Sequence, residues 1–280
     1  MKINYGNIPD EYSYLENSKI VIIPIPYGKT SSWIKGADKG PTAILEASAN
    51  MELYDIETDS EVYIKGIHTD APIIAYNAEE LIKASRASVL LHINDGKFIV
   101  TIGGEHTVSI GPAMAHSEAY PDLTILHLDA HSDRRESYDN DSYSHACTMA
   151  RIEDFTRKTV SVGIRSMDSS EKDSINSKRI IYAQEIYNSD KWIDRTCDLL
   201  TDDVYVTIDL DVLDPSIMPS TGTPEPGGLS WYQILSLFKK IAAERNIVGF
   251  DVVELCPTDN KAPDFLAAKL IYKLLSYINQ

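Results

Sequence analysis

The sequence predicts an α/β protein with a mainly parallel β-sheet that helices cover on both faces. Two observations lead to this prediction. Short apolar, β-branched runs alternate with segments of helical spacing, which is typical of a parallel sheet enclosed by helices. No internal repeat, Gly/Ser-rich linker or long charge block divides the 280 residues, so we expect a single domain over residues 1–280. In such folds ligands bind beyond the carboxyl ends of the strands.

The expected strands are runs that are apolar throughout, which indicates burial on both faces of the sheet. They occupy residues 19–24, 98–102, 123–128, 159–164, 179–182, 204–208 and 247–253.

The expected helices lie between these strands. Ser230 is a suitable N-cap for the helix that starts at Trp231, and Pro263 directly precedes the last helix. The helical segments are residues 41–50, 79–93, 147–156, 190–200, 231–245 and 264–278.

Composition excludes several classes of protein. The 26 Lys and Arg against 42 Asp and Glu give a net charge of −16, which opposes nucleic-acid binding and suits a small cationic substrate. No apolar run is long enough to span a membrane, and the first ten residues lack the pattern of a signal peptide. The three cysteines are widely spaced and form no CxxC pair, so we expect a reducing, cytoplasmic location.

Acidic and imidazole side chains follow three of the expected strands. LTILHLDAHSD carries Asp, His and Asp at alternate positions, VYVTIDLDVLD carries two Asp in the same way, and a third strand ends in GGEH. Alternate residues of extended backbone project to one side. The strands therefore deliver two imidazoles and four carboxylates to one edge of the sheet, those of His106, Asp129, His131, Asp133, Asp209 and Asp211.

This set of side chains predicts a metal centre. Four neighbouring aspartates cannot all stay ionised without positive charge, because they raise one another's pKa and burial disfavours each anion. Carboxylate and imidazole ligands without thiolates favour Mn²⁺ over a structural Zn²⁺. Six ligands are too many for one catalytic ion with an open position, so we expect two Mn²⁺ ions per subunit that share a bridging water.

Three further residues each admit two interpretations. His127 lies deeper in its strand and is expected to be a packed, hydrogen-bonded residue behind the site rather than a ligand. His145 is either a surface histidine or a proton shuttle whose pKa stays near its ordinary value. Glu254 ends an apolar strand, where it needs a cationic partner: either a neighbouring Lys or Arg forms a salt bridge with it, or it serves another guanidinium, which would pair with it bidentately. The TGTPEPGG loop at residues 221–228 is expected to form a wall of the pocket.

At these motifs the sequence resembles the ureohydrolase family, the arginases and agmatinases. The resemblance implies a three-layer, arginase-like α/β fold with two Mn²⁺ ions held by the six residues named above. Two segments, TGTPEPGGLS and YSHACTM, are more similar to agmatinases than to arginases. The matching segments span most of the chain in order: GADKGPTAILEAS, GGEHTVS, HLDAHSD, IDLDVLDP, TGTPEPGGLS and DVVELCP.

The resemblance also implies an activity, the hydrolysis of agmatine to putrescine and urea by a hydroxide that bridges the two ions, a reaction of polyamine biosynthesis. By the same resemblance, His145 shuttles protons and contacts the substrate, Glu254 binds the substrate guanidinium, and Asp133 passes a proton to the leaving amine. A small cationic guanidino substrate is implied, and so is a homo-oligomer, either a trimer or a hexamer.

Two alternatives stay open. The first is a related enzyme acting on arginine, guanidinobutyrate or a formimino amino acid. Arg134 and Arg135 follow the metal motif and suit a substrate carboxylate, whereas Glu136, Asp139 and Asp141 in the same loop suit an ammonium group. The second alternative is an inactive, metal-stabilised oligomeric binding protein on the same scaffold.

Overall fold

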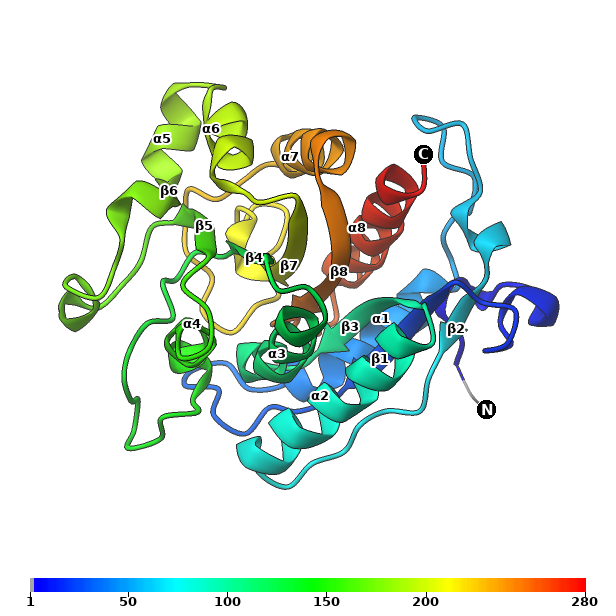
Figure 1. Cartoon of the computed structure of the whole chain (residues 1–280), viewed down its shortest axis with the longest axis horizontal. Coiled ribbons are helices and arrows are strands. Elements are labelled where there is room, and N and C mark those ends of the chain that lie inside the picture. Colours follow the sequence, from blue (N-terminus) through cyan, green and yellow to red (C-terminus); the bar gives the residue numbers. More distant parts are fainter. Residues whose placement is uncertain (1–2) are drawn as a thin grey trace.

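The structure is a computed structural model that describes residues 3–280. Within these residues, eight strands form one sheet in which all neighbouring strands are parallel (Figure 1). Their order across the sheet is β2-β1-β3-β8-β7-β4-β5-β6. The bounds are β1 Ile20–Ile25, β2 Ile67–Thr69, β3 Phe98–Gly103, β4 Thr124–Leu128, β5 Thr159–Ile164, β6 Ile180–Tyr182, β7 Asp203–Asp209 and β8 Asn246–Val253.

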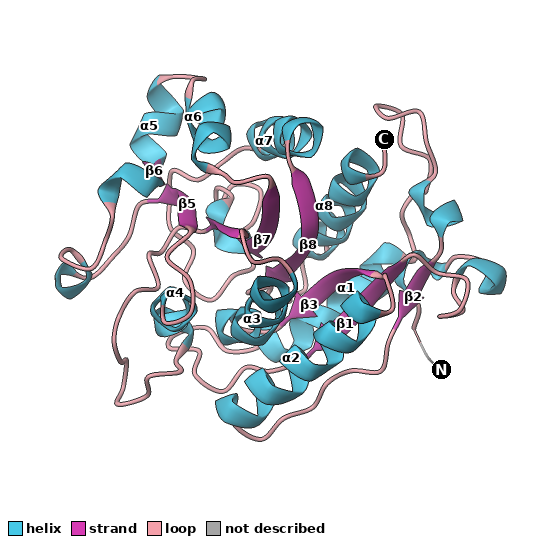
Figure 2. Ribbon diagram, viewed as in Figure 1, coloured by secondary structure: helices cyan, strands magenta, loops and turns pink. Residues whose placement is uncertain are grey.

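Helices cover both faces of this sheet (Figure 2). Buried side chains of α1, α5, α6, α7 and α8 share one core cluster with the sheet, while those of α2, α3 and α4 form two clusters on the opposite face. No helix within residues 3–280 combines the length and hydropathy needed to cross a membrane. The bounds are α1 Gly40–Ser48, α2 Ala78–Asn94, α3 Ile110–Ala119, α4 Thr148–Glu153, α5 Ala183–Asn188, α6 Trp192–Leu199, α7 Trp231–Glu244 and α8 Ala262–Ile278.

The period of the strands explains the two cores. In β1, Ile20 and Ile22 belong to the cluster under α1 and α8, whereas Val21 and Ile23 belong to the cluster under α2. Successive side chains of a strand point to opposite faces, so a strand with helices on both sides is apolar at every position. The predicted fold class, a mainly parallel sheet between two layers of helices, is confirmed.

Three elements were absent from the prediction: β2, α3 and α5. β2 and α5 are only three and six residues long, too short for a clear periodic signal. The first turn of α3 contains Gly111 and Pro112, which resemble a turn in the sequence. Proline is nevertheless tolerated in the first helical turn, because its missing N–H would have no intrahelical partner there.

Four neighbouring strands at the centre of the sheet carry the motifs. β3, β8, β7 and β4 lie side by side and end at the same edge. Beyond β3 the chain passes close to another segment, because a Cβ at Gly104 would overlap the carbonyl oxygen of Tyr27. Glycine is required for this close approach of two backbones.

Candidate active site

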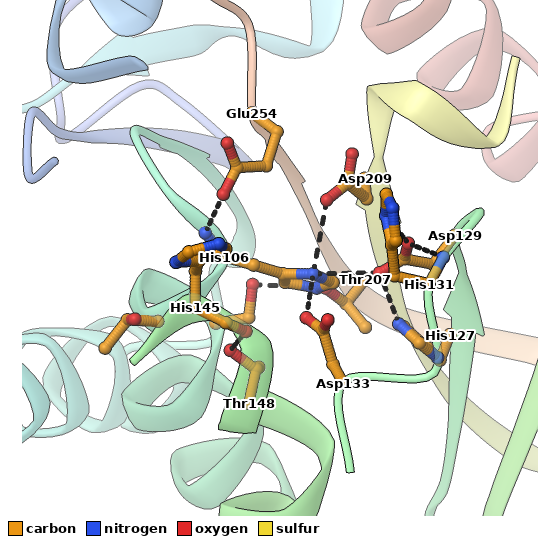
Figure 3. A network of polar contacts seen from close by, with 12 residues as sticks. His106, His127, Asp129, His131, Asp133, His145, Thr148, Thr207, Asp209 and Glu254 are labelled. Carbon is orange, nitrogen blue, oxygen red and sulfur yellow. Dashed lines mark hydrogen bonds and ion pairs between the residues drawn. The ribbon is translucent and has the colours of Figure 1, made fainter. Parts of the chain in front are cut away.

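A buried cluster of three carboxylates surrounds one imidazole nitrogen. His106 Nδ1 lies 3.1 Å from Asp129 Oδ2, 3.1 Å from Asp133 Oδ2 and 3.4 Å from Asp209 Oδ2 (Figure 3). These residues lie at the carboxyl ends of three different strands: His106 follows β3, Asp129 and Asp133 follow β4, and Asp209 is the last residue of β7. The convergence expected from the sequence is therefore present.

A second group overlaps the first. His131 Nδ1 lies 2.9 Å from Asp211 Oδ2 and 3.6 Å from Asp129 Oδ1. Asp129 belongs to both groups of side chains whose ligand atoms are close enough to hold a metal ion. The structure thus brings all six predicted residues together in two adjoining groups.

The ring orientation of His106 suits metal coordination. Its Nε2 lies 3.0 Å from Thr207 Oγ1, which donates its hydrogen to Asp251 Oδ1 at 2.8 Å. Nε2–H therefore donates to Thr207, and Nδ1 points at the three carboxylates without a hydrogen-bond partner of its own. A cation beside Nδ1 would satisfy both the nitrogen and the carboxylates.

The pKa values of the carboxyl groups reflect a shortage of positive charge. Burial and the neighbouring Asp211 and Asp129 raise the pKa of Asp209 well above its ordinary value. Burial and Asp129 raise the pKa of Asp133 to about 6. Burial also acts to raise the pKa of Asp129, but the surrounding imidazoles, His127 first, hold it well below its ordinary value. The side chains therefore fit the divalent ions that the sequence predicts.

Glu254 lies beside this cluster with no cation of the chain. The residue is 8% exposed, and its Oε1 accepts a hydrogen bond of 2.7 Å from the backbone N–H of His106. Burial and the nearby Glu105 raise its pKa to about 8. No Lys or Arg among residues 3–280 forms an ion pair with it, so the alternative of an internal salt bridge is wrong. Its backbone is left-handed, at φ 67°, a conformation that costs free energy and clusters at functional sites.

His145 also lines the cavity, but not as an exposed residue. Its backbone N–H donates to Thr30 Oγ1 at 2.9 Å, and Thr30 donates in turn to Glu105 Oε1 at 2.9 Å. Burial, together with repulsion from His106 and His131, lowers the pKa of His145 to about 4. The expectation of a pKa near the ordinary value was wrong, because His145 is only partly exposed and both its backbone N–H and its ring Nδ1 contact Thr30 Oγ1.

His127 occupies the expected place behind the site. It is buried, with Nε2 2.8 Å from Asp129 Oδ2 and Nδ1 3.0 Å from Ser161 Oγ. It is also close enough to His106 and Asp133 to be counted among the possible ligands of the first group.

The cavity above the two groups has a volume of about 280 Å³. Gly222 and Thr223 form part of its wall, as expected for the TGTPEPGG loop. Its outer part contains residues that the sequence analysis missed, namely Tyr138, Met167, Asp168 and Glu171. Asp168 and Glu171 had one signal, the Asp-x-x-Glu spacing, which also marks the start of a helix and is used here as a capping box. Tyr138 and Met167 had none.

The two arginines after the metal motif point in different directions. Arg135 lines the cavity, and its Nη2 lies 3.6 Å from Asp168 Oδ2. Arg134 is buried and paired with Glu153. Glu136, which was considered for binding an ammonium group, does not line this cavity and instead pairs with Arg151.

The pKa of Glu254 predicts a pH-dependent stability for the metal-free protein. The folded pKa of about 8 exceeds the ordinary 4.5, so the free energy of unfolding falls as the pH rises from about 4.5 to about 8. Glu254→Gln lacks this loss and is expected to gain stability relative to the wild type as the pH rises through this window. Denaturant unfolding in chelator at about pH 5 and about pH 8 measures the difference. An equal difference at both pH values would contradict the prediction.

Comparison with known proteins gives the family. A model described as the arginase family matches residues 18–276. The chain belongs to the arginase family. It is 36% identical to the N(1)-aminopropylagmatine ureohydrolase of Synechocystis sp., over 93% of this chain and 89% of the relative. It is 35% identical to the agmatinase of Bacillus anthracis, over 86% and 85% of the two chains.

Solved structures of other members of the arginase family have the same fold. The agmatine ureohydrolase of Thermoplasma volcanium aligns with a TM-score of 0.90 and 29% identity, over 100% of this chain and 95% of that chain. These findings confirm the predicted family and a hydrolase that acts on linear amidine carbon–nitrogen bonds. The roles of individual residues and the homo-oligomer stay predictions.

Proposed function

We propose that this member of the arginase family hydrolyses the guanidinium group of agmatine to putrescine and urea with two Mn²⁺ ions. The observation that carries the proposal is Glu254, a buried carboxylate without a cation of the chain, placed beside the two acidic groups. A planar guanidinium pairs well with a carboxylate and supplies the missing positive charge.

The donor atoms support the metal assignment. His106, Asp133 and Asp209 would hold one ion, His131 and Asp211 the other, and Asp129 would contact both. When bound, two such ions supply a nucleophilic water of lowered pKa and stabilise negative charge on the attacked group.

The side chains of the site supply binding and proton transfer. Glu254 binds and orients the guanidinium, with one of its oxygens already held by the N–H of His106. Asp133, placed beside His106 Nδ1 at 3.1 Å, transfers a proton to the departing amino nitrogen. His145, which burial keeps neutral, exchanges protons with the solvent side of the cavity.

The outer cavity favours a cationic tail over a carboxylate. Arg134 is turned away, and Arg135 faces two acids, with Asp168 at 3.6 Å and Glu171 at 3.9 Å. The charge of Arg135 is therefore compensated. The remaining negative charge of Asp168 and Glu171 suits an ammonium group. Agmatine ends in such a group. Guanidinobutyrate has a carboxylate in its place, and arginine has a carboxylate in addition to it.

A second candidate substrate is N(1)-aminopropylagmatine, whose tail carries a further amine. Two observations favour it: relatives such as the Synechocystis enzyme bear its name, and the outer cavity continues past the metal groups to Met167 and the half-exposed Asp168. The longer tail would place its second amine near this carboxylate.

Urea release from Mn²⁺-loaded protein tests the proposal with agmatine, N(1)-aminopropylagmatine, arginine and guanidinobutyrate. We expect kcat/KM for the two cationic compounds to exceed that for the two carboxylates by about 100-fold, since like charges at close range cost several kcal/mol. A preference for arginine or guanidinobutyrate would refute the substrate assignment. No urea from any compound would favour the inactive binding protein.

Asp168→Asn tests the outer cavity separately. We expect it to lower kcat/KM for the preferred cationic compound by about fivefold, because one charge pair near the surface contributes about 1 kcal/mol. Asp173→Asn removes an exposed acid from the same segment and serves as the matched control. Equal effects of the two variants would show that Asp168 does not contact the tail.

A further inference from the structure

Arg134 is a buried guanidinium beside the metal groups that the proposed reaction does not use. The residue is 5% exposed and is not among those that line the cavity. Nε and Nη2 contact Glu153 Oε1 at 3.0 and 2.9 Å, and Nη1 donates to the carbonyl oxygen of Ser132 at 2.9 Å. Burying an ion pair is costly, and such pairs are often no more stabilising than apolar residues. Stability alone therefore does not explain why Arg134 is buried at this position.

A fourth contact of Arg134 leads toward the metal groups. Nη2 donates to Ser161 Oγ at 3.1 Å. A guanidinium only donates hydrogen bonds, so the serine oxygen is an acceptor here and its own hydrogen is directed to another neighbour. That neighbour is His127 Nδ1, at 3.0 Å.

The far side of the His127 ring has the matching polarity. Nε2 lies 2.8 Å from Asp129 Oδ2, and a carboxylate accepts hydrogen bonds. Ser161 donating to Nδ1 leaves the ring hydrogen on Nε2, where Asp129 accepts it. The opposite tautomer would set a lone pair against the carboxylate and would present a second imidazole to the first metal group, which His127 is close enough to join.

We propose that Arg134 is a positioning residue for the metal centre, acting through Ser161 and His127 on Asp129. The relay holds His127 in the tautomer whose Nε2–H orients the Asp129 carboxylate between the two groups, and it keeps His127 out of the ligand set. The backbone N–H of His131 already holds Asp129 Oδ1 at 2.5 Å. The hydrogen bond from His127 Nε2–H to Oδ2 therefore fixes the second oxygen of the same carboxylate. The inference rests on the proposed metal centre.

Ser161→Ala tests the relay and leaves the Arg134–Glu153 pair intact. We expect it to raise the Kd for Mn²⁺ by about tenfold, the usual scale for groups that orient metal ligands. It should also increase the preference for Zn²⁺ over Mn²⁺ in competition, because a freed imidazole favours Zn²⁺. Ser85→Ala is the control: Ser85 is a buried serine of α2 that donates to Leu81 O at 2.7 Å, and its loss should leave the Kd for Mn²⁺ unchanged.

Two further measurements separate the relay from general damage to the core. In ¹⁵N spectra of Zn²⁺-loaded protein labelled at histidine, His127 Nε2 should carry a hydrogen in the wild type and lose it in Ser161→Ala. In the background of His127→Phe, Ser161→Ala should no longer change the Kd for Mn²⁺, because the residue through which it acts is gone.

Arg134 itself is tested by the double variant Arg134→Leu/Glu153→Leu, which removes both charges of the buried pair and so avoids an unpaired ion. We expect this double variant to raise the Kd for Mn²⁺ by the same factor as Ser161→Ala. An unchanged Kd for Mn²⁺ in Ser161→Ala would overturn the inference while leaving the proposed function intact. So would a change in Kd from Ser161→Ala that is as large in the His127→Phe background as in the wild type. A wild-type protein that binds no Mn²⁺ would overturn both.

Discussion

Replacing Asp129 by Asn is expected to abolish both Mn²⁺ binding and urea release. Asp129 is the residue common to the two groups, 3.1 Å from His106 Nδ1 and 3.6 Å from His131 Nδ1. The amide has nearly the same size but no charge, so each ion would lose an anionic ligand at once. Metal content after gel filtration and urea release with the preferred guanidino compound measure the two losses.

His131→Ala gives an internal comparison. His131 belongs to one group only, so we expect one Mn²⁺ per chain to be lost at a concentration where Asp129→Asn loses both, with urea release again at background. Asp139→Asn is the matched control for loss of charge, because Asp139 is exposed and does not line the cavity. Full activity of Asp129→Asn without metal would refute the metal centre.

Replacing Glu254 by Gln is expected to lower kcat/KM by about 10²- to 10³-fold while the protein still binds both Mn²⁺ ions. Removing one partner of a buried, hydrogen-bonded charge pair costs about 2–5 kcal/mol, and each 1.4 kcal/mol is a factor of ten. The glutamine oxygen can still accept from the backbone N–H of His106, which limits the structural change. Initial rates and metal content on the same preparation measure both quantities.

The control for this variant is Glu136→Gln, an exposed glutamate paired with Arg151 outside the cavity. Its kcat/KM should change by less than about threefold, as for an exposed ion pair. If Glu254→Gln instead loses its metal, Glu254 acts on the ions and not on the guanidinium. Unchanged kcat/KM in Glu254→Gln would remove the observation on which the proposed function depends.

The sequence was sufficient for the elements that have a local signal. The apolar runs predicted seven of the eight strands within residues 3–280 to within about two residues at each end, which is the usual uncertainty of element boundaries. The alternate Asp and His positions after β4 and β7 predicted which side chains would meet, because the period of an extended backbone is a local property. β2 and α5 were missed because their signals are too short.

Other features depended on segments far apart in the chain. The acids of the outer cavity, Asp168 and Glu171, come from the loop after β5, and their spacing is equally that of a helix cap. The backbone N–H of His145 is held by Thr30, which lies 115 residues away. No local pattern contains such contacts.

The sequence by itself determined the residue types of the site and the strand ends that carry them, since side-chain chemistry and backbone period are properties of short segments. The tertiary structure alone decided that β3, β8, β7 and β4 are neighbours, that Arg135 faces the cavity and that Arg134 turns into the core. The physical reason is that strand order and side-chain direction follow from packing two layers of helices on the sheet, which involves contacts across the whole chain.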